Sequence, residues 1–175
     1  VFFYNKTKFD ELGLTAPTTW QELHDVAKAY TEATGQAAFG YDDLFGMFLQ
    51  YMLQNDVGYV VDGQVAFNNE KGVEAMAFLL DLFKNGYART AGEDRYLSGP
   101  FNNGLVGGYI GSSAGAAYVK PVDFEYSAAA IPMGVKGAAM QAGTNLAMFT
   151  QDTAKQAAVW EYIKFLTSTE STVYW

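Results

Sequence analysis

The chain has 175 residues, half of them hydrophobic, which is enough to bury the core of one domain or of one lobe of a larger protein. Its 19 acidic and 11 basic residues give a formal net charge of −8, and no cluster of Lys and Arg is present, which argues against a nucleic-acid partner. The lack of cysteine excludes disulfides, thiolate metal sites and cysteine nucleophiles, and no apolar run reaches the ~18 residues of a membrane span.

The first part of the chain predicts alternating strands and helices. Residues 1–5 are expected to form a buried strand, and residues 6–13 a short helix that ends at Gly13. Thr19 and Glu22 have the spacing of a capping box, so they predict the start of a helix that ends at Gly35. A strand is then expected over residues 37–41, followed by two aspartates and a helix through residues 44–55.

The second part continues the alternation. Asp62-Gly63, between two β-rich runs, predicts a hairpin, and Asn69 predicts the cap of a helix that Asn85-Gly86 ends. Strands are expected over 105–111, 124–134 and 143–149, with a helix opening at Ser113 and a last helix near Asp152. The stripes expected to be buried are Val73, Met76, Ala77, Leu80 and Phe83 on the first of these helices, and Val159, Trp160, Ile163 and Leu166 on the last. This pattern indicates an α/β protein with a mixed sheet.

One turn has the spacing of a serine-hydrolase elbow, Gly111-x-Ser113-x-Gly115. A serine nucleophile needs a base, and in those hydrolases the histidine follows the serine, whereas the only histidine here is His24. The glycines around the turn also lack the Gly-Lys-Ser/Thr ending of a phosphate loop. The turn is therefore interpreted as a tight strand-to-helix connection whose free amides face an oxygen-rich ligand.

Asp42 and Asp43 follow the predicted strand at 37–41 and precede a helix. They either cap that helix, or one of them bonds a ligand hydroxyl. Glycosidases need two carboxylates across the scissile bond, and adjacent strand residues point to opposite faces. Aromatic residues near the strand ends, among them Tyr41 and Phe45, favour a sugar or polyol, whose C–H faces are apolar and whose rim is polar.

Five segments, taken in order, resemble motifs of the family 1 extracellular solute-binding proteins of ABC importers. The first is FFYNKTKFDELGLTAPTTWQELHDVAKAY, which is similar to the family's Tyr-Asn-Lys-x-x-Phe-x-x-x-Gly-Leu…Pro-x-Thr-Trp-x-Glu-Leu. The others are VAFNNEKGVEAMAFLLDLFKNG, FNNGLVGGYIGSSAG, AGTNLAMF and AAVWEYIKFLTSTE. They cover nearly the whole chain. Two departures are GLVGGYI in place of Gly-Lys/Glu-Ala-Ala-Met, and Thr169 in place of a proline.

The resemblance implies a periplasmic-binding-protein-like (type II) lobe, an α/β fold with a mixed sheet flanked by helices. Residues 1–127 would be the second, C-terminal ligand-binding lobe of a two-lobed clamshell. Residues 128–175 would hold the hinge-crossing strand, the return strand and a helix, with the crossing near 128–134. The family's signal or lipoprotein peptide, first lobe and C-terminal tail are missing, so the chain is expected to be a piece of a longer protein.

The resemblance also implies ligand contacts at Asp42 and Phe45, at Ser112 or Ser113, and at Gly143. Joined by the strand-end residues Tyr41 and Asp43, these form the predicted ligand site. In open α/β sheets, ligands lie outside the carboxyl ends of the strands, so the turns at Tyr41–Phe45 and at 112–113 are expected on one edge. No residue is predicted to be catalytic or to bind a metal, and no cofactor is expected.

The function implied is that of the substrate-binding subunit of an ABC importer. It would capture a sugar, polyol or glycerol phosphate outside the cell, in the periplasm or lipid-anchored to the outer face of the membrane, and deliver it to the permease subunits as a monomer. One alternative is a carbohydrate-active hydrolase domain that uses Asp42 or Asp43. Another is an adhesion or scaffold module.

Overall fold

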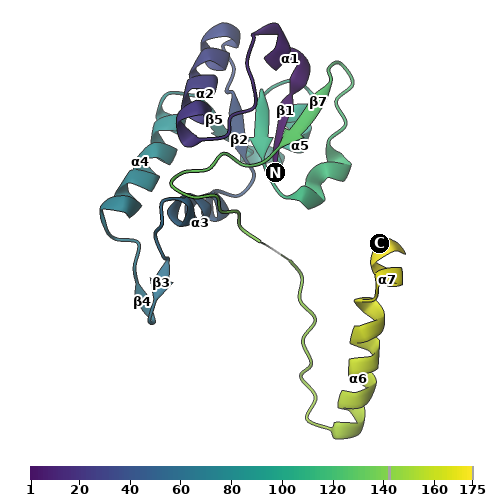
Figure 1. Cartoon of the computed structure of the whole chain (residues 1–175). Helices are drawn as coiled ribbons and strands as arrows, with labels where there is room; N and C mark the ends of the chain where they lie inside the picture. The colour runs from purple at the N-terminus through teal and green to yellow at the C-terminus, as the bar shows by residue number, and fades with distance from the viewer. Residues whose placement is uncertain (142, 175) are drawn as a thin grey trace. The chain divides into compact units, whose positions relative to one another are not determined.

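The computed structural model describes residues 1–141 and 143–174, and its contacts divide the chain into two compact units, Val1–Met140 and Gln141–Trp175. The first unit is built on a five-stranded sheet with the order β5-β2-β6-β1-β7 (Figure 1). Its strands are β1 (Phe2–Asn5), β2 (Phe39–Tyr41), β5 (Ala88–Thr90), β6 (Gly108–Ile110) and β7 (Tyr126–Ala129). β1 runs antiparallel to both of its neighbours, and the other four run parallel, so those four end at one edge, here called the carboxyl edge.

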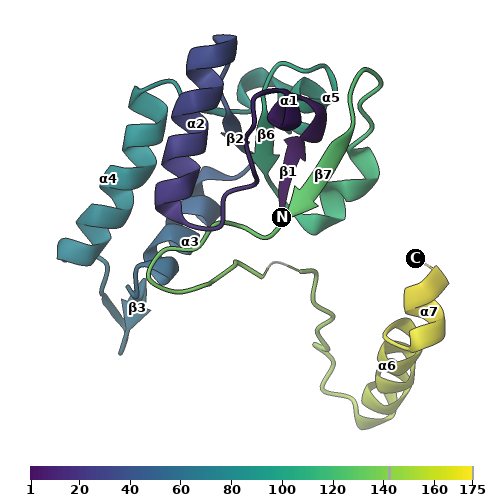
Figure 2. The same cartoon turned by 45° about the horizontal axis from the view of Figure 1, so that its top comes forward.

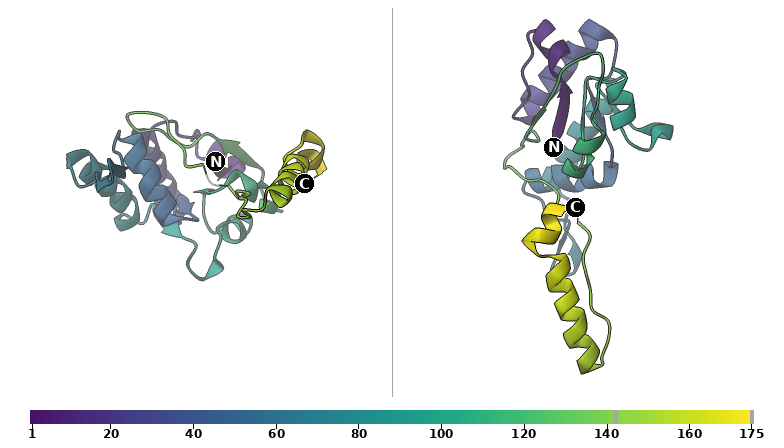
Figure 3. Two further views of the ribbon diagram at one scale, coloured as in Figure 1. Left: turned by 90° about the horizontal axis from the view of Figure 1, so that it is seen from below. Right: turned by 90° about the vertical axis from the view of Figure 1, so that its right-hand side faces the viewer.

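The helices lie on both sides of this sheet. The first unit has the helices α1 (Lys6–Glu11), α2 (Trp20–Thr34), α3 (Leu44–Gln54), α4 (Glu70–Lys84) and α5 (Ser98–Asn102), and the 3-10 turns η1 (Gly92–Asp94) and η2 (Ser113–Tyr118). Figures 2 and 3 show α1, α2 and α4 on one side of the sheet and α5 on the other. A separate hairpin, β3 (Val60–Val61) and β4 (Gln64–Val65), follows α3. No helix within residues 1–141 and 143–174 has the length and apolar character of a membrane span.

Alternation along the strands gives the first unit two cores. Phe2 and Ile110 point into a large core shared with α1 to α4, whereas Phe3 and Tyr109, their neighbours in sequence, point into a smaller core with α5. Successive side chains of a strand face opposite sides of a sheet, so apolar residues at consecutive positions can serve both cores. The sheet is therefore buried on both faces, as expected for an α/β fold.

Local signals in the sequence set the ends of the main helices. The hydroxyl of Thr19 accepts the N–H of Glu22 at 3.2 Å, and the Glu22 carboxylate accepts the N–H of Thr18 at 2.7 Å, which confirms a capping box at the start of α2. Gly35 ends this helix with φ of 70°, and the Asn69 side chain caps α4. Asp62-Gly63 forms the predicted hairpin turn with positive φ at both residues.

The buried stripe of α4 differs from the expected one. The structure buries Ala75, Leu79 and Leu82, whereas Val73 is 63% exposed and Leu80 is 45% exposed. Both sets of residues have helical spacing, so the sequence pattern does not determine which of the two faces of α4 is buried. Packing against α3 determines it. A groove of about 320 Å³ between α3 and α4 is lined by four members of the expected stripe, Val73, Met76, Ala77 and Leu80, together with Phe48, Met52 and Phe67.

The second unit holds α6 (Thr153–Leu166) and α7 (Thr169–Tyr174). The carboxylate of Asp152 accepts the N–H groups of Ala154 and Lys155, as a helix start near Asp152 predicted. Two other expectations were wrong for this structure: α6 buries none of its residues, with Trp160 54% exposed, and residues 143–149 form no strand. A strand needs a pairing partner and a helix needs a surface to cover, and a unit of this size supplies neither.

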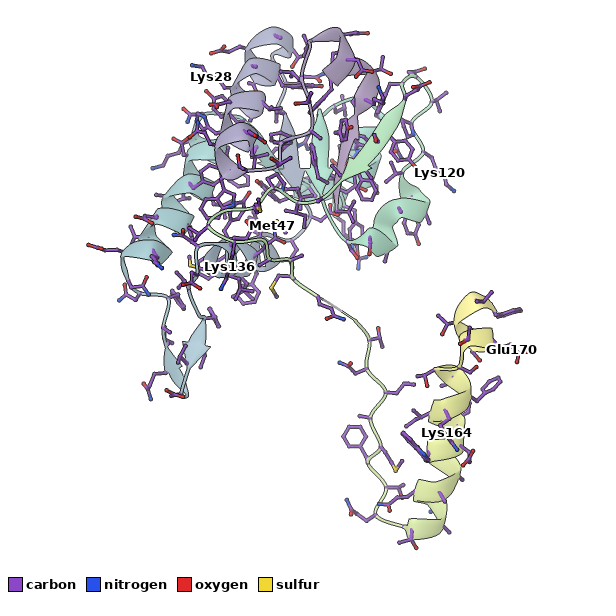
Figure 4. The ribbon with its side chains drawn as sticks, in the orientation of Figure 1. Lys28, Met47, Lys120, Lys136, Lys164 and Glu170 are labelled. Carbon is purple, nitrogen blue, oxygen red and sulfur yellow. The ribbon has the colours of Figure 1, made fainter. Side chains whose placement is uncertain are left out.

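The segment after β7, residues 131–138, is fastened to the first unit by Gln54 at the end of α3. The Gln54 amide donates to Pro132 O at 3.0 Å and to Ala138 O at 2.9 Å, and its oxygen accepts the indole N–H of Trp20 at 2.6 Å. Lys136 adds an ion pair with Asp56, and Figure 4 shows Lys136 beside α3. The first compact unit ends at Met140.

Candidate functional site

The carboxyl edge brings together two turns that are far apart in the sequence. Tyr41 at the end of β2 is paired with Ile110 at the end of β6, and the strands are parallel. The turn that begins at Asp42 therefore lies beside the turn at 111–113, on the one edge predicted for them. The Asp42 N–H points to the Ile110 carbonyl at 3.5 Å.

One carboxylate oxygen of Asp42 accepts a hydrogen bond from the described chain, and the other does not. Its Oδ1 accepts the N–H of Leu97 at 2.7 Å, while Oδ2 lies over Gly111 and makes no hydrogen bond to any described residue. A Cβ at position 111 would be 2.6 Å from that oxygen, so a glycine is required here. The carboxyl is half-buried, and this burial raises its pKa. A half-buried acceptor with a free lone pair is suited to a solute hydroxyl.

Asp43 has a different role from its neighbour. Its carboxylate accepts the N–H of Phe45 at 3.0 Å and caps α3, as one of the two interpretations of the aspartate pair predicted. The first turn of α3 leaves Phe45 59% exposed. The two aspartates thus do not form a matched pair of carboxylates, because one is exposed and serves as a cap while the other is half-buried against Leu97.

The serine turn is a cap as well. Ser112 precedes η2, and its hydroxyl accepts the N–H of Ala114 at 3.2 Å, whereas Ser113 is exposed in the first position of η2. His24 lies elsewhere, with its Nε2 3.2 Å from the carboxylate of Asp81 on α4 and its ring against Tyr87. Ser113 therefore has no histidine beside it, in agreement with the interpretation of this turn as a strand-to-helix connection.

Two tyrosines near the carboxyl edge are buried. Tyr41 has no exposed surface, and its hydroxyl lies 2.8 Å from that of Tyr51, so it supports the edge from within the core and does not offer a face to a solute. Burial raises the pKa of both hydroxyls. Tyr109 in β6 is buried as well, and burial raises its pKa to about 12.

A partly exposed aromatic cluster, which the sequence did not predict, adjoins the first turn of α3. Phe45 and Tyr59 meet edge to face, with ring centroids 6.1 Å apart, and Tyr59 stacks on Phe67 at 5.1 Å and 8°. Phe48 meets Phe67 edge to face at 5.5 Å. We call Phe45, Phe48, Tyr59 and Phe67 the aromatic shelf. Its only sequence signal was the hairpin, which predicts that the residues before and after it lie side by side.

The remaining predicted residue, Gly143, belongs to the second compact unit. Its place in the ligand site therefore stays a prediction. Within residues 1–141 and 143–174, no three His, Asp or Glu side chains are grouped as a metal ion would require.

Comparison with known proteins gives a family over the full length of the chain. The family described as bacterial extracellular solute-binding protein matches residues 1–175. None of the curated proteins matches the sequence significantly.

Several solved structures share the fold. A Thermotoga lettingae ABC transporter solute-binding protein bound with alpha-D-tagatose is 25% identical with a TM-score of 0.77, covering 100% of this chain and 49% of that one. The cyclic alpha-maltosyl-1,6-maltose binding protein of Arthrobacter globiformis is 24% identical with a TM-score of 0.76, covering 97% and 46%. UgpB of Mycobacterium tuberculosis, in complex with glycerophosphocholine, is 20% identical with a TM-score of 0.75, covering 99% and 46%. The chain thus spans about half the length of these proteins.

Proposed function

Because this chain belongs to the bacterial extracellular solute-binding proteins, we propose that it is part of the substrate-binding subunit of an ABC importer. The subunit captures a carbohydrate or glycerol-phosphate-like solute outside the cell and delivers it to the permease subunits. It acts as a monomer without a cofactor and carries out no reaction on its solute. It works in the periplasm or lipid-anchored to the outer face of the membrane.

One observation carries this proposal: the turns after β2 and β6 meet at the carboxyl edge, with the Oδ2 atom of Asp42 free to accept a hydrogen bond. We assign solute contacts to Asp42, Phe45 and the 112–113 turn, with Tyr41 and Asp43 holding the edge in place. We also propose Gly143 as a solute contact. The proposed solute class is supported by the descriptions of solved proteins with this fold, which name tagatose, a cyclic maltosyl-maltose and glycerophosphocholine.

We place the second lobe in residues 1–127 and the crossing between the lobes within residues 128–175, near 128–134. The hydrogen bonds from the Gln54 side chain to the carbonyls of Pro132 and Ala138 hold the start of this segment against the end of α3. A clamshell of two lobes buries its solute between them, so this lobe would supply half of the contacts.

The test is a titration of the complete protein with a panel of sugars, polyols and glycerophosphocholine, followed by calorimetry and by thermal melting. We expect at least one solute to bind and to raise the melting temperature, because binding to the folded state alone stabilises it. Asp42→Asn exchanges the free oxygen for an amide donor and should weaken that binding about tenfold, as expected for losing a hydrogen bond to a charged group. Turnover of a chromogenic glycoside or ester, lost in Ser113→Ala or Asp43→Asn, would contradict the proposal.

A further inference from the structure

We propose that Tyr109 and Asp42 together bind one hydroxyl-bearing oxygen beside Gly111. The tyrosine hydroxyl donates a hydrogen bond to this oxygen, and Oδ2 of the carboxylate accepts one from it. The oxygen belongs either to a water molecule or to a hydroxyl of the solute. The second of these sources rests on the proposed function, and the first does not.

Tyr109 places a buried hydroxyl near the carboxyl edge. Its side chain is 1% exposed, and its hydroxyl has no hydrogen-bond partner among the described residues. Buried polar groups are nearly always hydrogen-bonded, because a buried group without a partner has lost its hydration and gained nothing in return. The Tyr109 hydroxyl therefore needs a partner from outside the described chain.

The space left by Gly111 joins this tyrosine to the free oxygen of Asp42. A Cβ at position 111 would lie 2.6 Å from Oδ2 of Asp42 and 2.9 Å from Cε2 of Tyr109, so both side chains border the same point. Cε2 is bonded to the ring carbon that carries the hydroxyl. The hydroxyl itself lies beside η2, at 3.8 Å from the position that a Cβ of Gly115 would take. Two glycines thus leave space beside one unpaired donor and one unpaired acceptor.

The sheet explains why the two side chains meet. Tyr109 and Gly111 are two positions apart at the end of β6, so they face the same side of the chain. Asp42 follows the last residue of β2, which runs parallel beside β6. Leu97, whose N–H binds the other oxygen of Asp42, lies with Tyr109 in the smaller core.

The chemistry of the pair selects the group between them. Burial raises the pKa of Tyr109 to about 12, and the charges of Asp42 and then of Tyr126 on β7 contribute to this shift, so the tyrosine is a hydrogen-bond donor at neutral pH. An ionised carboxylate only accepts. A water or an alcohol can accept one bond and donate another, whereas a phosphodiester oxygen has no proton to give to the carboxylate.

The first test is a carbon NMR titration of the Asp42 carboxyl in the complete protein without solute, with the signal assigned by its loss in Asp42→Asn. Tyr109→Phe keeps the ring and removes the donor. If water is bound there, this variant should raise the pKa of Asp42, because hydrogen bonds to a carboxylate favour its charged form. Tyr51→Phe is the matched control, since it removes a buried hydroxyl from the larger core, where that hydroxyl is bonded to Tyr41.

The second test is calorimetry of the same variants with maltose, glycerol and glycerophosphocholine, after thermal melts have shown that each variant is folded. Tyr109→Phe should weaken the binding of a hydroxyl-bearing probe about two- to tenfold, as expected for the loss of one hydrogen bond. A raised pKa of Asp42 without solute assigns the oxygen to water. Weaker binding with an unchanged pKa assigns it to a hydroxyl of the solute.

Two results would overturn the inference and leave the proposed function standing. One is an unchanged pKa of Asp42 together with unchanged affinity in Tyr109→Phe. The other is a pKa rise of the same size in Tyr51→Phe. Binding of none of the probes counts against the proposed function instead, and the titration then decides the inference alone: a raised pKa of Asp42 supports it, and an unchanged pKa overturns it.

Discussion

At the scale of single residues, Asp42 is both a half-buried carboxyl that costs folding free energy and a proposed solute contact. Its carboxyl is half-buried and accepts one backbone N–H, while the missing side chain of Gly111 leaves space for the second oxygen. Burial of a charged group without full compensation destabilises a fold, so residues of this kind are typical of binding sites. The sequence placed Asp42 and Asp43 correctly at a strand end, but their separate roles depend on Leu97 and Phe45, which only the folded chain brings to them.

We predict that Asp42→Asn raises the free energy of unfolding at pH 7 and leaves it nearly unchanged at pH 3. Burial raises the pKa of Asp42 in the folded state, with the Leu97 N–H opposing this shift more weakly. Below the pKa of the unfolded chain, about 3.9, both states are protonated and burial has no electrostatic cost. As the pH rises through the folded-state pKa, the buried carboxyl becomes charged and its contribution to stability is lost.

Urea denaturation at both pH values measures this effect. Asp43→Asn is the control, because it removes the same charge from an exposed position and Asn caps a helix as well as Asp does. An equal gain in the free energy of unfolding in both variants, or a loss in Asp42→Asn at pH 7, would contradict the prediction that burial of the Asp42 carboxylate destabilises the fold.

At the scale of secondary-structure elements, the sequence predicted the features that depend on local interactions. The capping box at Thr19, the cap at Asn69 and the Asp62-Gly63 turn are each decided by residues a few positions apart. The sequence did not predict the rotation of α4 or the exposure of α6, because both depend on surfaces supplied by other parts of the chain. The aromatic shelf was missed for the same reason: it unites residues from α3 and from both sides of a hairpin.

The end of α3 offers a matched pair of substitutions. Gln54 and Gln50 are both buried and lie one helical turn apart, but Gln54 makes three hydrogen bonds, whereas the Gln50 side-chain nitrogen has no partner among the described residues. We predict that Gln54→Leu lowers the free energy of unfolding by roughly 2–4 kcal/mol, since two carbonyls and an indole N–H lose their partners. Gln50→Leu should be neutral or stabilising.

Denaturant unfolding gives the two energies, and hydrogen exchange locates the change. The amide of Lys136 donates to the Gln54 carbonyl, so it should exchange faster in Gln54→Leu while the amides of β1 keep their protection. Similar losses of unfolding free energy in Gln54→Leu and Gln50→Leu would mean that side-chain volume, and not the hydrogen bonds of Gln54, determines stability at the end of α3.

At the scale of the whole molecule, the chain corresponds to about half of the proteins whose fold it shares. If the solute is buried between two lobes, residues 1–175 alone leave one side of it in water. We predict that this chain by itself binds any solute of the complete protein no more tightly than about 1 mM, because it forfeits half of the gain of about 8 kcal/mol that micromolar affinity requires. Calorimetry on residues 1–175 that gave micromolar affinity would contradict the two-lobe model.

The position of β1 in the sheet governs the order in which the protein can fold as it is made. Residues 2–5 are synthesised before their partners, which are residues 108–110 on one side and 126–129 on the other. At a synthesis rate of about 5–20 residues per second, the first strand waits several seconds for its neighbours, and closing so long a loop is slow. Neither core can close in that interval, because β1 and β6 contribute residues to both, so the nascent chain stays open until β6 and β7 have been made.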